Sequence, residues 1–346
     1  MSKKIAVVLL NLGGPDKLSS VKGFLFNLFY DPAIIRLRNP FRWLLAKLIS
    51  SRREEKAKEI YAKMGGSSTI LLATKKQANL LEIDLNKRLQ EEFKVFVSMR
   101  YWHPFAKEVA KKIEIWGAEE VLLLPLYPQF STTTTRSSLD EFSEEMKNRK
   151  LKTICCYYKD PYFIKAHAEL ISKAVSEIDK REKYRILFSA HGLPEKIIKQ
   201  GDPYQYQVEE TVKEVLKQLA PKTDYVICYQ SKVGPLKWLM PSTEEELHRA
   251  AKDNVAVIVV PIAFVSEHSE TLVELDIDYK ELFESISTKA YIRVPALNEN
   301  ENFIKSLFEQ IKFILKEESV TTKENLQIFS STKCPNKLKE CFCKKR

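Results

Sequence analysis

The sequence has no apolar stretch long enough to cross a membrane. A membrane-spanning helix needs roughly 18 or more consecutive apolar residues, and no run in this chain reaches that length. The first apolar run, Ile5–Leu10, is also too short for the apolar region of a secretory signal. Only six cysteines occur among 346 residues. We therefore expect a cytoplasmic protein with free thiols, because disulfide frameworks belong to oxidising compartments.

Signatures of nucleic-acid binding are missing too, although the formal net charge is +10. The sequence contains no zinc-finger spacing, no RNA-binding signature and no basic helix with interleaved aromatic residues. Excess positive charge also suits an anionic membrane surface, an acidic substrate or simply a lysine-rich surface. We expect no nucleic-acid partner, and the sequence leaves the oligomeric state open.

Short apolar and β-branched runs predict eight strands, and helical patterns separate them. The predicted strands are 4–11, 93–99, 119–127, 152–158, 184–190, 223–229, 254–263 and 288–294. Alternating strands and helices indicate parallel sheets with helices on both faces. We predict an α/β protein with two Rossmann-like doubly wound domains, each with a four-stranded parallel sheet.

The predicted domains are 1–155 and 156–318, because 346 residues exceed the roughly 150 typical of one domain. A basic, cysteine-containing tail, 319–346, follows them, and we expect it to be poorly ordered. Residues 21–49 are apolar and aromatic, with Lys and Arg between them. This segment predicts either short amphipathic helices packed on the core or an apolar lip that contacts a membrane interface.

A histidine ends one of the predicted strands. His191 follows strand 184–190, and in open parallel sheets ligands bind beyond the carboxyl ends of the strands. An imidazole with an ordinary pKa of about 6.5 can accept a proton at neutral pH or ligate a metal ion. The alternative is a histidine that is hydrogen-bonded to a backbone carbonyl and has no chemical role.

Acidic residues follow another predicted strand, 254–263. Glu270 and Glu274 are four residues apart, so they share a face of the helix predicted there, and Glu267 extends the stripe. Like charges at this spacing repel, so we expect a bound cation, a shared proton or a basic neighbour; a solvated acidic face is the alternative. His268 cannot share the face of Glu270 in a regular helix. The group predicts a site that moves protons or holds a divalent metal.

Motifs along the chain resemble those of the ferrochelatases, which insert ferrous iron into a porphyrin in the last step of haem synthesis. The motifs are Asn11-Leu-Gly-Gly-Pro15, Gly65-Gly-Ser-Ser68, Arg100-Tyr-Trp-His-Pro104, Leu126-Tyr-Pro-Gln129, Ser189-Ala-His-Gly-Leu-Pro194, Gly201-Asp-Pro-Tyr204, Tyr229-Gln-Ser-Lys-Val-Gly-Pro235-Leu-Lys-Trp238 and Pro261-Ile-Ala-Phe-Val-Ser-Glu-His-Ser-Glu-Thr-Leu272. They occur in the family's order over roughly residues 4 to 316. The resemblance implies two Rossmann-like halves that face each other across a cleft.

The resemblance also implies a role for each candidate residue. His191 and Glu270 correspond to the pair taken to bind iron, and His268 and Glu274 to a relay for protons and metal. The residues that correspond to the lining of the porphyrin cleft are Leu12, Arg53, Tyr61, Ser68, Arg100, Tyr101 and Tyr127. The implied reaction inserts Fe²⁺ into protoporphyrin IX and releases two protons, with no cofactor beyond the substrate iron. The family is often peripheral to membranes, which favours a lip at 21–49.

The cysteines depart from the pattern of animal-type relatives. Those relatives bind a 2Fe–2S cluster through one cysteine just after the Tyr-Pro-Gln motif and three cysteines in a C-x2-C-x4-C tail. Here Thr132 holds the first position, and the tail carries Cys334, Cys341 and Cys343 in C-x6-C-x-C spacing. Three tail cysteines and an internal one could still hold a cluster in another arrangement.

Two other functions stay open. A related chelatase could insert iron into coproporphyrin or cobalt into a corrin precursor, because such enzymes share the fold and the histidine. A porphyrin or haem carrier without turnover is the second alternative. The acidic group beside His268 argues against a carrier, which needs one axial ligand and no path for protons.

Overall fold

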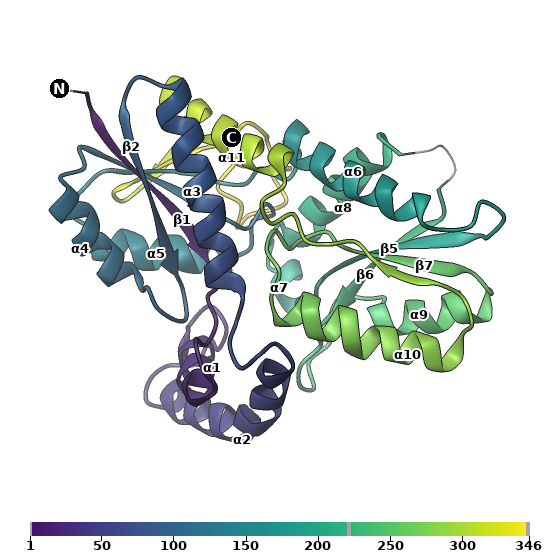
Figure 1. The fold of residues 1–346 in the computed structure, drawn as a ribbon. Coiled ribbons are helices and arrows are strands. Elements are labelled where there is room, and N and C mark those ends of the chain that lie inside the picture. The colour runs from purple at the N-terminus through teal and green to yellow at the C-terminus, as the bar shows by residue number, and fades with distance from the viewer. Residues whose placement is uncertain (1, 220–222, 344–346) are drawn as a thin grey trace. The chain divides into compact units, whose positions relative to one another are not determined.

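The computed structural model of the protein describes residues 2–219 and 223–343, and it divides into two compact units (Figure 1). Unit 1 takes the described chain up to Tyr157, the segment Leu307–Cys334 and the described residues from Phe342. Unit 2 takes Tyr158–Ser306 and Pro335–Cys341. Each unit has its own sheet, so the predicted α/β class with two sheets is confirmed.

Unit 1 is built on a six-stranded sheet with the order β2-β1-β3-β4-β10-β9. The strands are β1 (Lys4–Asn11), β2 (Glu92–Met99), β3 (Glu120–Pro125), β4 (Leu151–Ile154), β9 (Thr321–Lys323) and β10 (Leu326–Phe329). Strand β1 runs parallel to both neighbours, with Val8 opposite Phe96 in β2 and Leu123 in β3. Its continuous buried apolar run is typical of a central parallel strand.

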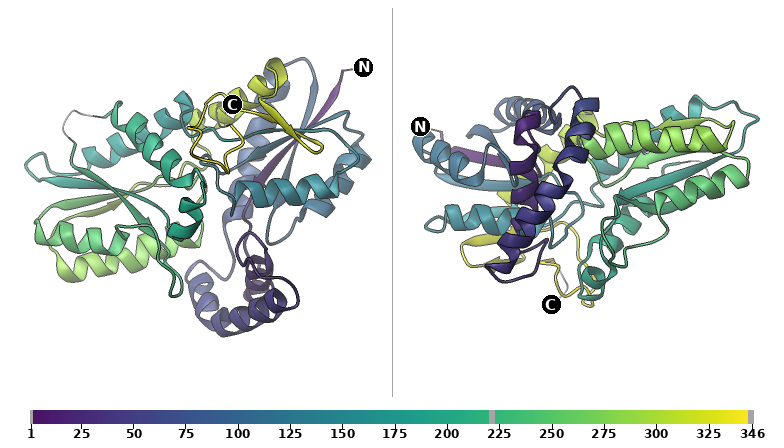
Figure 2. Two further views of the ribbon diagram at one scale, coloured as in Figure 1. Left: turned by 180° about the vertical axis from the view of Figure 1, so that it is seen from behind. Right: turned by 90° about the horizontal axis from the view of Figure 1, so that it is seen from below.

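The prediction of a four-stranded sheet in the first domain was wrong. Strand β10 pairs in parallel with β4, and β9 pairs antiparallel with β10 (yellow in Figure 2). Leu326, Ile328 and Phe329 are buried, so this short strand adds apolar surface to the core of unit 1. The expectation of poor order after residue 318 was wrong for the same reason. Residues 344–346 of the tail lie outside the described part of the chain.

The helices of unit 1 are η1 (Leu18–Ser20), α1 (Val21–Tyr30), α2 (Phe41–Lys63), α3 (Ile70–Arg88), α4 (Ala106–Trp116) and α5 (Thr135–Glu145). The expectation of short helices in 21–49 was wrong for the second half of this segment, because Phe41 begins a helix of 23 residues. Helices α1 and α2 lie together in Figure 1 and bury an apolar cluster. Its core is Val21, Phe24, Leu25, Tyr61 and Tyr101. Among the described residues, no helix combines the length and apolar character needed to span a bilayer.

Unit 2 has the predicted four-stranded parallel sheet, with the order β6-β5-β7-β8. Its strands are β5 (Tyr184–His191), β6 (Tyr225–Gln230), β7 (Ala256–Pro261) and β8 (Tyr291–Arg293). Its helices are α6 (Pro161–Ser176), α7 (Glu195–Lys199), α8 (Tyr204–Leu216), α9 (Thr243–Lys252), α10 (Tyr279–Ile286) and the start of α11 (Glu301–Lys316). In the sheet, His191 lies opposite Gln230, and Ser189 lies opposite Pro261. The carboxyl ends of β5, β6 and β7 therefore meet at one edge.

The helix predicted after β7 begins in an unusual form. Residues Glu270–Asp278 (η2) form a π-helix, and α10 continues directly from it. A π-helix pairs each residue with the one five positions away, is rare, and occurs frequently at functional sites. This segment carries the candidate acids, so the irregular turn lies where the sequence predicts chemistry.

Candidate functional site

His191 ends β5 and is hydrogen-bonded to Glu270, the first residue of η2. Its Nδ1 lies 2.7 Å from Glu270 Oε2. A carboxylate oxygen accepts hydrogen bonds, so Nδ1 donates, and the neutral imidazole keeps the lone pair of Nε2 for a proton or a metal ion. The His191 side chain is 37% exposed, so Nε2 can be reached by a substrate. The structure thus brings the predicted histidine and carboxylate together.

Ser231, the residue after β6, bridges the two candidate glutamates. Its Oγ lies 3.0 Å from Glu270 Oε2 and 2.5 Å from Glu274 Oε2, and its backbone N–H donates to Glu274 Oε1 at 2.9 Å. Gln230 Nε2 also donates to Glu274 Oε2 at 3.2 Å, and Tyr279 OH donates to Oε1 at 3.1 Å. Glu274 is therefore held at both oxygens, and the two acids lie side by side as predicted.

Burial and charge act in opposite directions on these groups. Desolvation alone would lower the pKa of His191, but Glu270 and Glu274 outweigh it, so the pKa is raised. Desolvation would raise the pKa of Glu270, but the charge and hydrogen bond of His191, with His268 and Ser231, hold it well below its usual range. For Glu274, desolvation and the charge of Glu270 both raise the pKa. A basic neighbour therefore offsets the repulsion that the sequence analysis anticipated.

His268 lies just before η2 and also faces Glu270. Its Nδ1 is 3.0 Å from the carbonyl oxygen of Ser266, so Nδ1 donates, and Nε2 lies 4.0 Å from Glu270 Oε1. Residues at this spacing cannot share a face in a regular helix, but His268 precedes the helix, and its non-helical backbone lets it face Glu270. Glu267 does not join the acidic stripe as predicted; its carboxylate pairs with Arg293 at 2.5 Å.

Two of the predicted substrate-binding residues are held by partners inside unit 1. Arg100 pairs with Asp31 at 3.0 Å and with Glu141 at 3.1 Å, and its Nε donates to Ser137 Oγ at 2.8 Å. Tyr101 OH donates to Asp31 Oδ2 at 2.7 Å. Desolvation raises the pKa of Glu141 to about 7, although Arg100 opposes the shift. Each nitrogen of the Arg100 guanidinium therefore has a partner within the unit.

The other predicted lining residues also belong to unit 1; they are Leu12, Arg53, Tyr61, Ser68 and Tyr127. Leu12 and Tyr61 pack with Tyr101 in the apolar cluster of α1 and α2. The Arg53 guanidinium lies over the Phe29 ring, 5.7 Å from its centroid. His191 belongs to unit 2, and a common cleft that joins it to these residues stays a prediction.

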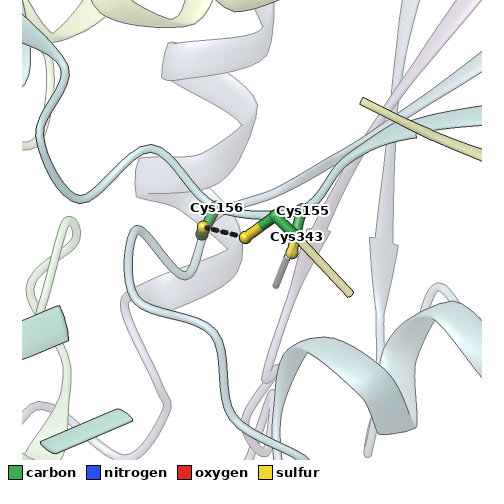
Figure 3. A group of neighbouring side chains, drawn as sticks. All are labelled: Cys155, Cys156 and Cys343. Carbon is green, nitrogen blue, oxygen red and sulfur yellow. Dashed lines mark hydrogen bonds between the residues drawn. The ribbon is translucent and has the colours of Figure 1, made fainter. Parts of the chain in front are cut away.

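Buried cysteines from distant segments gather in unit 1 (Figure 3). Cys155 and Cys156 follow β4, and the tail supplies Cys334 and Cys343. The Cys343 sulfur lies 3.6 Å from that of Cys156 and 3.8 Å from that of Cys334. The sulfur atoms of Cys155, Cys156 and Cys343 all lie within 4.8 Å of one another. The pairing of β10 with β4 thus brings the tail to two internal cysteines that the sequence analysis did not single out.

Sequence analysis also missed Ser231 beside the candidate acids and Asp31 as the partner of Arg100 and Tyr101. Ser231 stands inside the Tyr-Gln-Ser-Lys motif, and Asp31 stands in an Asp-Pro pair that predicts only a break in the helix. These two short patterns were the signals that the sequence offered, but neither shows which residue the Ser231 or Asp31 side chain contacts.

Known proteins are similar to this chain in sequence and in fold. The ferrochelatase family model matches residues 4–313. A ferrochelatase of Rickettsia felis is 50% identical over 349 residues, covering 99% of each chain, and one of Pelagibacter ubique is 48% identical, covering 98% of each. The structure of SirB from Bacillus subtilis with Fe³⁺ has a TM-score of 0.54 at 11% identity, covering 90% of this chain and 96% of that one, which indicates a shared fold. The chain belongs to the ferrochelatase family.

Proposed function

We propose that this protein inserts Fe²⁺ into protoporphyrin IX to form protohaem, with release of two protons. Its membership of the ferrochelatase family supports this reaction. The observation that carries the site assignment is the hydrogen bond from His191 Nδ1 to Glu270, which leaves Nε2 as an exposed base. A positioned imidazole is a common general base, and a pyrrole N–H must lose its proton before iron can bind the ring nitrogens.

Glu270, His268 and Glu274 have separate roles around the His191 base in this proposal. Glu270 orients the His191 ring and stabilises the imidazolium that forms when Nε2 takes a proton. The substrate Fe²⁺ arrives along the Glu270 side, where Oε1 and His268 Nε2 face each other at 4.0 Å. Glu274, whose pKa is raised by burial and by Glu270, passes the proton onward. In this assignment the metal contacts are Glu270 and, only while its Nε2 is unprotonated, His191.

The residues of unit 1 named above line the porphyrin cleft in this proposal. Leu12 and Tyr61 offer apolar contact to the macrocycle, and Arg53 offers a charge to its carboxylates. Arg100 is already paired with two carboxylates. In this proposal Arg100 and Tyr101 therefore shape the wall of the cleft and do not supply a free charge to the porphyrin carboxylates.

An anaerobic assay with Fe²⁺ and protoporphyrin beside coproporphyrin tests the proposal. We expect many turnovers of protohaem per enzyme and a higher kcat/KM for protoporphyrin. A higher kcat/KM for coproporphyrin would favour the related chelatase. Stoichiometric binding of the porphyrin or haem without turnover would favour the carrier.

The buried cysteines fit a 2Fe–2S cluster as a resident cofactor. Four thiolates are the usual ligands of such a cluster. The Cys343 sulfur lies close to those of Cys156 and Cys334 in unit 1, and Cys341 is two residues from Cys343 in the chain. We assign the cluster to these four, with Cys155 next to them. Anaerobically purified protein should show visible absorption from the cluster and equimolar iron and acid-labile sulfide.

The C156S variant should lose the absorption, the iron and the sulfide. The control variant C228S changes a buried cysteine of unit 2 and should keep all three. A colourless protein that contains zinc would contradict the assignment.

Peripheral membrane contact is the last part of the proposal. Phe41 and Leu44 on α2 are 67% and 54% exposed, and Arg42 and Lys47 lie between or beside them. Apolar side chains flanked by basic ones bind the surface of anionic bilayers. The double variant F41S/L44S should lose cosedimentation with anionic vesicles, whereas I115S, a highly exposed residue of α4, should not. Equal vesicle binding by the wild-type protein, F41S/L44S and I115S would contradict membrane contact through this segment.

A further inference from the structure

The backbone of Ser231 adopts a conformation that serine rarely takes. Its φ is +64°, in the left-handed region that favours glycine. Glycine would occupy this position without strain, so a side chain is retained here at a cost in stability. Residues held in this way cluster at functional sites, where surrounding contacts compensate for the strain.

What serine has and glycine lacks at this position is a hydroxyl group between two carboxylates. Ser231 Oγ lies 3.0 Å from Glu270 Oε2 and 2.5 Å from Glu274 Oε2. The backbone N–H of the same residue donates to Glu274 Oε1 at 2.9 Å. A single residue therefore contacts three of the four carboxylate oxygens of the pair.

These contacts decide which oxygen of Glu270 is left for a ligand. Oε2 is occupied by His191 Nδ1 at 2.7 Å and by Ser231 Oγ. Oε1 makes no hydrogen bond within the described residues, and it faces His268 Nε2 at 4.0 Å. If Oε2 lost the serine, the carboxylate could rotate about its last bond, and Oε1 would no longer be directed at His268.

We propose that Ser231 is a positioning residue that holds Glu270 and Glu274 in the orientation needed to receive the metal. The inference rests on the proposed function, because it concerns the use of Glu270 Oε1 by the incoming ion. Partners that orient metal-ligating groups typically change metal affinity or activity by roughly 10–100-fold when they are mutated. The porphyrin has no part in these contacts, so its binding is expected to stay unchanged.

Two substitutions separate the hydroxyl from the backbone. S231A removes the hydroxyl and keeps a Cβ, and S231G removes the hydroxyl and relieves the strained φ. We expect both to raise KM for the metal by roughly 10–100-fold with KM for porphyrin unchanged. S285A, at an exposed serine of α10, is the matched control.

The glycine variant carries the decisive result. Wild-type turnover in S231G would show that only the backbone conformation matters and would overturn the proposal. Equal loss of metal and porphyrin affinity, or unfolding of S231G by circular dichroism, would assign the hydroxyl to the fold and overturn it as well. Zn²⁺ affinity, measured without porphyrin, should fall in S231A and S231G; unchanged affinity would contradict the proposal even if iron turnover declined. If wild-type protein has no chelatase turnover, the proposed function fails, independently of the Ser231 result.

Discussion

Two carboxylates of this protein, Glu270 in unit 2 and Asp31 in unit 1, differ in how many of their oxygens accept hydrogen bonds. Asp31 Oδ2 accepts from Arg100, Tyr101 and Ser137, and Oδ1 accepts from the backbone of Ala33. Among the described residues, the hydrogen bonds to the Glu270 carboxylate all go to Oε2. A fully paired carboxylate holds elements together, whereas one with an unoccupied oxygen beside two histidines can bind something else. Comparing the two distinguishes a structural charge network from a reactive one.

The largest effect is expected at the reactive network. H191A removes the proposed base, so we expect loss of metal insertion by at least about 100-fold, with porphyrin binding retained. Anaerobic turnover and a fluorescence titration of porphyrin measure the two properties. Retained turnover would remove His191 from the mechanism and would place the base elsewhere.

The structural network should respond in stability. D31N keeps the shape of Asp31 but removes its charge, so Arg100 loses one of its two carboxylates inside unit 1. Breaking a buried ion pair on one side costs roughly 3–5 kcal/mol, and urea unfolding measures this loss. The activity of the folded variant should fall much less than that of H191A. A D31N protein that is as stable as wild type but inactive would show that Asp31 serves the reaction and not the fold.

A smaller effect is expected from Glu141 at the edge of the same network. Its pKa is raised from 4.5 to about 7, chiefly by burial, so between these pH values the folded protein binds more protons there than the unfolded chain. The free energy of unfolding therefore falls as the pH rises through this window. E141Q should gain stability relative to wild type between pH 5 and pH 8, as measured by urea unfolding. A difference that does not vary with pH would contradict the raised pKa.

Sequence reasoning located the reactive network more readily than the structural one. His191 ends one strand and Glu270 begins the helix after another, so strand prediction placed both near one edge, and the family motifs identified them as a pair. The partners of Asp31 lie about 70 and 106 residues away, and no local pattern indicates such pairs. The resemblance to the family assigned Arg100 to the porphyrin cleft, and the structure adds that its charge is matched within unit 1.

Other features were beyond local patterns altogether. An α-helix and a π-helix place Glu270 and Glu274 on one side in similar ways, so the sequence could not distinguish them. The positive φ of Ser231 could not be predicted either, because serine rarely adopts it. Strand β10 is only four residues long and stands in a polar, basic tail, which composition alone associates with disorder.

The place of β10 in the sheet sets an order on biosynthesis. Strand β4 ends at residue 154, but its neighbour β10 begins at residue 326. During translation the ribosome therefore releases the whole of Tyr158–Ser306 before this edge of the first sheet can be closed. The N-terminal strands emerge first, so until β10 is made the nascent protein carries an open sheet edge, the kind of surface that chaperones protect.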